Sequence, residues 1–294
     1  MRNQISSVFY YTLIGIAVIG LILNTLVIFI VIRKKQKSNF DIYVSCIAAV
    51  DNLRCFFGAF TTALVLFYGE DRNQIHTLEL IHIPVFYFSE FSSLILILLF
   101  NVNMYFFICR PIFHRQHYSL STQRKLILIG ILCAVLLTII ITSLEQMHLK
   151  FSHFYFLAHI FFALVVSTSN VFLCSSVYLQ IRSVRRRQEE RNALKYDTEC
   201  DEMQKKQEHM RKKEQKFLIV IIITNIIYVL FVIPNTVVGI RSIVENKNRQ
   251  FSNTGVITFI MSNVQFSLKF ITYVSFNKLF RKDTMALFRQ CCSK

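Results

Sequence analysis

Long apolar stretches alternate with short polar ones along the whole 294-residue chain. A helix needs about 20 apolar residues to cross the hydrocarbon core of a bilayer. Backbone groups in lipid must satisfy their hydrogen bonds internally, so each stretch is expected to be a helix. The pattern predicts an all-α membrane protein, a seven-transmembrane helix bundle forming a single domain over 1–294. The predicted spans lie near 8–32, 42–68, 78–108, 126–145, 153–181, 216–240 and 252–276.

Composition agrees with this pattern, since 54% of the residues are hydrophobic and only 17% are charged, with seven glycines and three prolines. A soluble domain usually carries more charge. The net charge of +16 would suggest a nucleic-acid partner in a soluble protein. No nucleic-acid-binding pattern accompanies it, so none is expected. The chain also has no catalytic triad, phosphate-binding loop or metal-ligand spacing, so we predict no enzyme activity, no cofactor and no metal site.

The basic residues are distributed unequally between the two sides of the predicted bundle. Links on one side hold 25 Lys or Arg and links on the other hold six, while Arg54 and Lys269 fall inside spans. Positive links stay in the cytoplasm. With seven spans, this places the N-terminus outside and the C-terminus inside a multi-pass protein of the cell membrane.

Two cytoplasmic segments have patterns of their own. The polar link 182–215 is predicted to form two helix extensions with a mobile centre near 196–201, and is either a plain solvated charge run or a surface for a cytoplasmic protein, which the resemblance given below would make a G protein. Segment 277–294 holds a short amphipathic helix and a tail, and the helix suits the inner leaflet of the membrane. Cys291 and Cys292 follow it at positions suited to lipidation by palmitate.

Five short motifs occur in order along the predicted spans. They are LNTLV at 23–27, IAAVDNL at 47–53, NMYFFICRPI at 103–112, Tyr228 six residues before Pro234, and YVSFNKLFR at 273–281. Together they resemble the motifs of rhodopsin-like (class A) G-protein-coupled receptors. Their counterparts in that family include Gly-Asn-x-Leu-Val, Leu-Ala-x-Ala-Asp-Leu-Leu and Asp-Arg-Tyr-x-Ala-Ile-Cys-x-Pro-Leu.

The resemblance implies a receptor that binds an external ligand, a small chemical, and activates a heterotrimeric G protein in the cytoplasm. The motifs match the family patterns only in part, and in this they resemble the motifs of nematode-type serpentine chemoreceptors. A transporter or channel of seven spans is a weaker alternative, because the chain shows no repeated halves and few Gly or Pro breaks.

The chain departs from the family at its switch positions. Asn103 and Met104 stand where the family has Asp and Arg, and Lys269 stands where it has Asn. Glu214 occupies the place of the acidic partner on span six, but the Arg that it would meet is missing. These departures leave open a receptor-like protein that does not signal and acts as a decoy or partner.

Ionisable residues in the middle of a membrane usually face the interior of the bundle and have partners. Asp51 and Arg54 are three residues apart on one helix face, close enough to pair. The resemblance places Lys269 opposite Asp51, so Lys269 and Arg54 are expected to supply the positive charge there. In the alternative, Arg54 reaches a water pocket and Lys269 only stabilises the fold.

Glu90 lies about 21 Å from Met104 along a helix, in the outer half where ligands of the family bind. It either meets a cationic or hydrogen-bonding ligand or makes a contact between helices. The residues assigned to ligand binding are Phe86, Tyr87, Glu90 and Asn235. The predicted intramembrane polar network is Asn24, Asp51, Arg54, Ser93, Lys269 and Tyr273. The predicted switch region, which contacts the G protein, is Asn103, Met104, Tyr105, Tyr178, Glu214 and Pro234.

Overall fold

The computed structural model describes most of the first two thirds of the chain. It covers residues 2–34, 39–68, 72–146 and 152–194. It also describes nine single positions, all of them helical, at Ile223, Ile226, Leu230, Pro234, Val237, Ile260, Val264, Arg281 and Met285. No strand occurs in these described parts.

The described chain forms six helices, most of them rich in apolar residues. They are α1 (Arg2–Arg33), α2 (Asn39–Tyr68), α3 (Arg72–Cys109), α4 (Pro111–His117), α5 (Leu120–Gln146) and α6 (Ser152–Leu194). The all-helical architecture predicted from the sequence is confirmed for this part of the chain.

Five of these helices are long and apolar enough to cross a membrane. Their candidate spans are Val8–Arg33, Phe40–Leu64, Ile83–Phe107, Leu120–Leu144 and Ile160–Gln180. Many large apolar side chains on them are exposed, such as Leu136 at 61% and Phe172 at 60%. An outer surface of this kind suits lipid rather than water. The predicted spans at 216–240 and 252–276 lie outside the described residues, apart from the single positions named above.

Several helices extend further than hydropathy alone predicts. α3 begins at Arg72 rather than near residue 78, α5 begins at Leu120 rather than near 126, and α6 continues to Leu194 rather than ending near 181. A hydropathy pattern ends where polar residues begin, whereas a helix continues as long as its backbone hydrogen bonds can form. The predicted helix extension into 182–215 is therefore present as far as Leu194.

The short helix α4 was not predicted. It begins at Pro111, which occupies the first turn, where the missing N–H costs no helix hydrogen bond. Its backbone joins directly to the end of α3, because the N–H of Arg110 bonds to the carbonyl of Phe106 at 3.0 Å. The turn between α3 and α5 is therefore ordered and helical.

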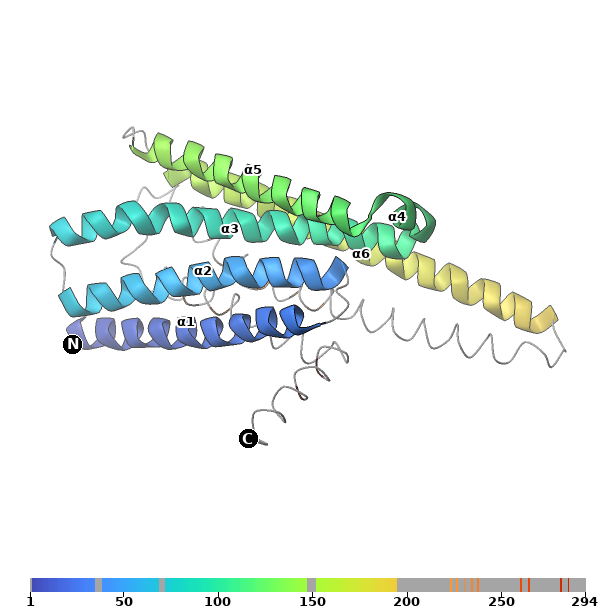
Figure 1. The fold of residues 1–294 in the computed structure, drawn as a ribbon, viewed down its shortest axis with the longest axis horizontal. Helices are drawn as coiled ribbons and strands as arrows, with labels where there is room; N and C mark the ends of the chain where they lie inside the picture. The colour runs from blue at the N-terminus through green and yellow to red at the C-terminus, as the bar shows by residue number, and fades with distance from the viewer. Residues whose placement is uncertain are drawn as a thin grey trace.

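α3 occupies the centre of the described bundle (Figure 1). It packs against α2 on one side and against α5 and α6 on the other, while α1 packs against α2. The approach of α5 is close at Gly130, since a Cβ added there would lie 2.9 Å from Cδ1 of Leu99 and 3.0 Å from Cγ2 of Ile95. Glycine therefore lets the two helices touch at this level.

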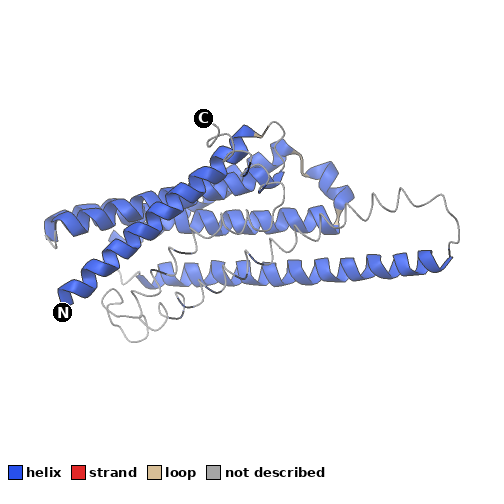
Figure 2. Ribbon diagram, turned by 90° about the horizontal axis from the view of Figure 1, so that it is seen from below, coloured by secondary structure: helices blue, strands red, loops and turns tan. Residues whose placement is uncertain are grey.

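The described parts of three basic links lie at one end of the bundle. Figure 1 shows that the C-terminal end of α1, the helix α4 and the projecting part of α6 all lie at this end. α6 extends well past the other helices there, as the turned view also shows (Figure 2). We call this the basic end, and define it by Arg33, α4 and the part of α6 beyond Gln180.

Candidate functional site

A buried ion pair joins α2 to α3. Nη1 of Arg54 contacts Oε2 of Glu90, and the two side chains are only 3% and 5% exposed. The guanidinium carbon of Arg54 also lies 4.1 Å from the centre of the Phe86 ring, a cation–π geometry. Arg54 and Glu90 are therefore held between two helices with an aromatic ring against the cation.

This arrangement bears on the two interpretations of Glu90. Its carboxylate meets Arg54, so the contact between helices that one interpretation expects is present, and the ligand-binding role stays a prediction. Phe86 is half-buried and engaged with the same cation, and Tyr87 is 8% exposed. From the sequence, Arg54 was expected to pair with Asp51, and its contact with Glu90 was not predicted. Asn235, the remaining ligand-binding prediction, lies outside the described residues.

A second polar contact between the same helices lies one helical turn from the ion pair. Asp51 is fully buried, and Oγ of Ser93 lies 3.4 Å from its Oδ1. Asn24 on α1 is 1% exposed. The predicted network members Asn24, Asp51, Arg54 and Ser93 thus lie inside the described bundle, whereas Lys269 and Tyr273 lie outside the described residues.

A third polar group lies toward the basic end, and we call it the amide cluster. The hydroxyl of Tyr43 donates to Oε1 of Gln123 at 2.7 Å, and Nε2 of Gln123 donates to Oδ1 of Asn103 at 2.5 Å. Nε2 of His114 lies 2.9 Å from the same Oδ1. Because that oxygen can only accept, His114 donates from Nε2. The cluster therefore ties together α2, α3, α4 and α5.

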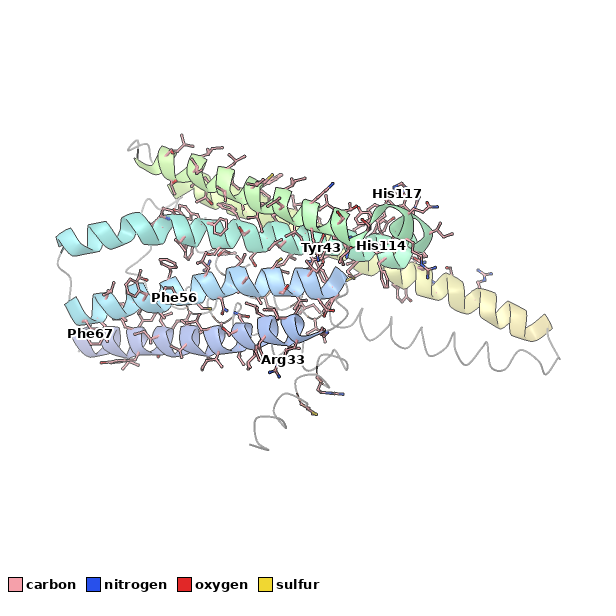
Figure 3. The ribbon with its side chains drawn as sticks, in the orientation of Figure 1. Arg33, Tyr43, Phe56, Phe67, His114 and His117 are labelled. Carbon is pink, nitrogen blue, oxygen red and sulfur yellow. The ribbon has the colours of Figure 1, made fainter. Side chains whose placement is uncertain are left out.

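All four side chains of the amide cluster are buried, with Tyr43 and Gln123 fully so. Figure 3 shows Tyr43 and His114 at the same end of the bundle, with His117 farther out on α4. The ring of His114 also stacks on Tyr118 at 5.4 Å with 8° between the ring planes. These contacts fix α4 against α3 and give the turn after span three a defined position.

The predicted switch region falls partly in and around this cluster. Asn103 is one of its members, and the neighbouring Met104 is buried at 3% exposure. The ring of Tyr105 lies 5.4 Å from that of Phe172 on α6. Tyr178, on α6, is 64% exposed. Pro234 is helical and half-buried, and Glu214 lies outside the described residues, as do Cys291 and Cys292.

Sequence reasoning missed Tyr43, His114 and Gln123, although it singled out Asn103. A Gln placed in the first turns of an apolar helix was the available signal, because a buried amide requires partners. It also missed the buried pair Asn101 and Asn170, in which Nδ2 of the first donates to Oδ1 of the second. This pair connects α3 to α6 in the apolar part of the bundle, where interhelical hydrogen bonds favour association.

Burial lowers the pKa of the His114 imidazole below its ordinary value. At pH values between the folded and the unfolded pKa of His114, the unfolded chain binds more protons than the folded chain. The contribution of His114 to stability is therefore complete above about pH 6.5 and falls as the pH drops. We therefore expect the thermal midpoint of the purified protein to fall between about pH 7.5 and about pH 5.5. His114→Gln, which can donate a hydrogen bond but does not titrate, should reduce that fall.

The exposed His117 supplies the matched control for this prediction. His117→Gln should leave the fall in thermal midpoint as large as in the wild type. An equal fall in the His114→Gln protein would show that this imidazole does not contribute.

The described residues contain no group of three or more His, Cys, Asp or Glu side chains that could hold a metal ion. Their polar groups are instead arranged as contacts between pairs of helices. These contacts position the helices and stabilise their packing.

No protein-family model and no curated protein matches this chain. The functional reading therefore rests on the residues and their arrangement.

Proposed function

We propose that the chain is a cell-membrane receptor of the rhodopsin-like kind, crossing the bilayer seven times with its N-terminus outside. It binds an external small chemical and activates a heterotrimeric G protein at the basic end, as a chemoreceptor. The observation that carries the proposal is the central position of α3. One polar contact, Arg54 with Glu90, lies in one half of the bundle, and another, the amide cluster, lies toward the basic end.

A receptor needs a connection of this kind between its outer half and its cytoplasmic end. Packed helices with discrete polar contacts can transmit a change because they have alternative arrangements rather than deforming continuously. The basic end, as defined by its described residues, supports the proposed orientation. The five-motif resemblance supports the receptor class.

The second candidate is a receptor-like protein that does not signal. Met104 favours it, because an apolar side chain at 3% exposure occupies the position that the resemblance gives to an arginine that meets the G protein.

Basal G-protein activation in cells separates the two candidates. Wild type, Met104→Arg and the size-matched control Met104→Leu are compared at equal surface density, because an arginine buried at this position costs stability. We expect basal activity above that of mock-transfected cells in the wild type and in Met104→Leu. A silent wild type beside an active Met104→Arg protein would contradict coupling and favour the second candidate. Silence of all three would contradict coupling without ligand, and a ligand screen would then replace the basal assay.

A further inference from the structure

The α4 surface combines exposed apolar and cationic side chains. Ile112 is 74% exposed and Phe113 is 41% exposed, although both are large and apolar. Arg110 and Arg115 are exposed beside them. Arg124 and Lys125, in the second turn of α5, are exposed as well. We use the name α4 surface for these six residues.

The cations of the α4 surface are not neutralised from within the described chain. The ion pairs of Lys34 with Asp41 and of Arg54 with Glu90 include no residue of the α4 surface. Four positive charges within residues 110–125 therefore have no carboxylate partner among the described residues. Such a concentration favours an anionic partner.

The surface also lies at a fixed depth. The candidate span on α3 ends at Phe107, and the next candidate span begins at Leu120 on α5. α4 lies within the short segment between them, so it lies at the boundary of the bilayer whichever way the protein is oriented. The aromatic rings of Phe113 and His117 lie 4.4 Å apart there. Aromatic side chains and basic residues are the usual constituents of interfacial helices.

We propose that the α4 surface binds the headgroups of anionic phospholipids in the inner leaflet. Ile112 and Phe113 insert at the level of the acyl boundary, and Arg110, Arg115, Arg124 and Lys125 meet phosphate and carboxylate oxygens. The choice of leaflet rests on the orientation in the proposed function. Lipid is favoured over a protein partner because the bilayer supplies apolar and anionic chemistry together at this depth.

The chain contains no tryptophan, so one introduced tryptophan is a unique fluorophore. The full-length Ile112→Trp protein is reconstituted in vesicles of phosphatidylcholine with a fixed fraction of phosphatidylserine. In one preparation the serine lipid is brominated, and in the other an equal fraction of the choline lipid is brominated. Bromine quenches tryptophan on contact, so the ratio of the two quenching values measures which lipid lies beside the α4 surface. If Ile112→Trp does not fold, Phe113→Trp replaces it.

We expect brominated phosphatidylserine to quench the tryptophan fluorescence more than about twofold more strongly than brominated phosphatidylcholine. The reason is that each cation near an anionic membrane surface adds to the attraction between protein and lipid. Adding Arg110→Gln and Arg115→Gln should lower the preference, and adding Arg124→Gln and Lys125→Gln as well should abolish it. Adding Arg182→Gln and Arg186→Gln removes the same charge from α6 and should leave it intact. In Val18→Trp, where the parent side chain is exposed in the middle of α1, both lipids should quench equally.

Two results would overturn the inference. Equal quenching of Ile112→Trp by both lipids would show that the surface inserts without recognising charge. Quenching by a water-soluble quencher and by neither lipid would show that the surface faces the cytoplasm and is open to a protein. Neither result depends on signalling, so failure of this inference is distinct from failure of the proposed function.

Discussion

Replacing either Arg54 or Glu90 alone by leucine will strongly destabilise the protein, whereas replacing both will cost less than either single change. Both side chains are at most 5% exposed and lie in candidate spans. Removing one partner takes the opposite charge away from a buried ion, which costs about 3–5 kcal/mol. Removing both leaves an apolar contact between α2 and α3, which a membrane interior tolerates. Arg54→Leu, Glu90→Leu and the double variant are compared by thermal unfolding in the same detergent.

The ion pair between Lys34 and Asp41 is the matched control. Its nitrogen and oxygen are 2.7 Å apart, but the Lys34 side chain is 17% exposed at the edge of the first span. Asp41 is only 6% exposed, but the partly exposed Lys34 ammonium can turn toward water. Asp41→Leu should therefore cost less than Glu90→Leu. If the double variant of Arg54 and Glu90 lost as much as the sum of its single variants, the two side chains would not be coupled.

Gln123→Leu will be the next most damaging single substitution. Gln123 is fully buried, accepts from Tyr43 and donates to Asn103, so its loss leaves a buried hydroxyl without its acceptor and a buried carbonyl with one donor fewer. The expected cost is about 1–3 kcal/mol. Tyr43→Phe removes one hydrogen bond and should cost less. The measurement is again the thermal midpoint of the purified protein.

Gln116 on α4 offers the same substitution at an exposed position. Gln116→Leu should change stability by no more than about 0.5 kcal/mol. Should Gln123→Leu prove equally neutral, the amide cluster would not hold the four helices together.

The helices were the most predictable part of the fold, because length and apolar composition determine which segments can cross a membrane. Their ends were not, since the start of α3 at Arg72 and the extension of α6 to Leu194 lie beyond the apolar core. α4 escaped prediction because seven residues are too few for a periodic signal.

For the candidate site, sequence reasoning located the polar residues but not their partners. The positions of Arg54 and Glu90 along their predicted spans identified them as ionisable residues inside the membrane, and the two belong to different helices. Their contact depends on how far each helix slides and rotates against its neighbour, and apolar periodicity does not fix this. The link between Gln123 and Asn103 was missed for the same reason.

The end of α6 projects beyond the candidate membrane span as a continuous helix. From Gln180, where the candidate span ends, the helix continues to Leu194 without interruption. At 1.5 Å per residue this is a length of about 21 Å. A tilt of about 10° at the membrane would move the tip by about 4 Å. A displacement too small to see inside the packed bundle would thus be magnified at Leu194, where a spin label or fluorophore could read it.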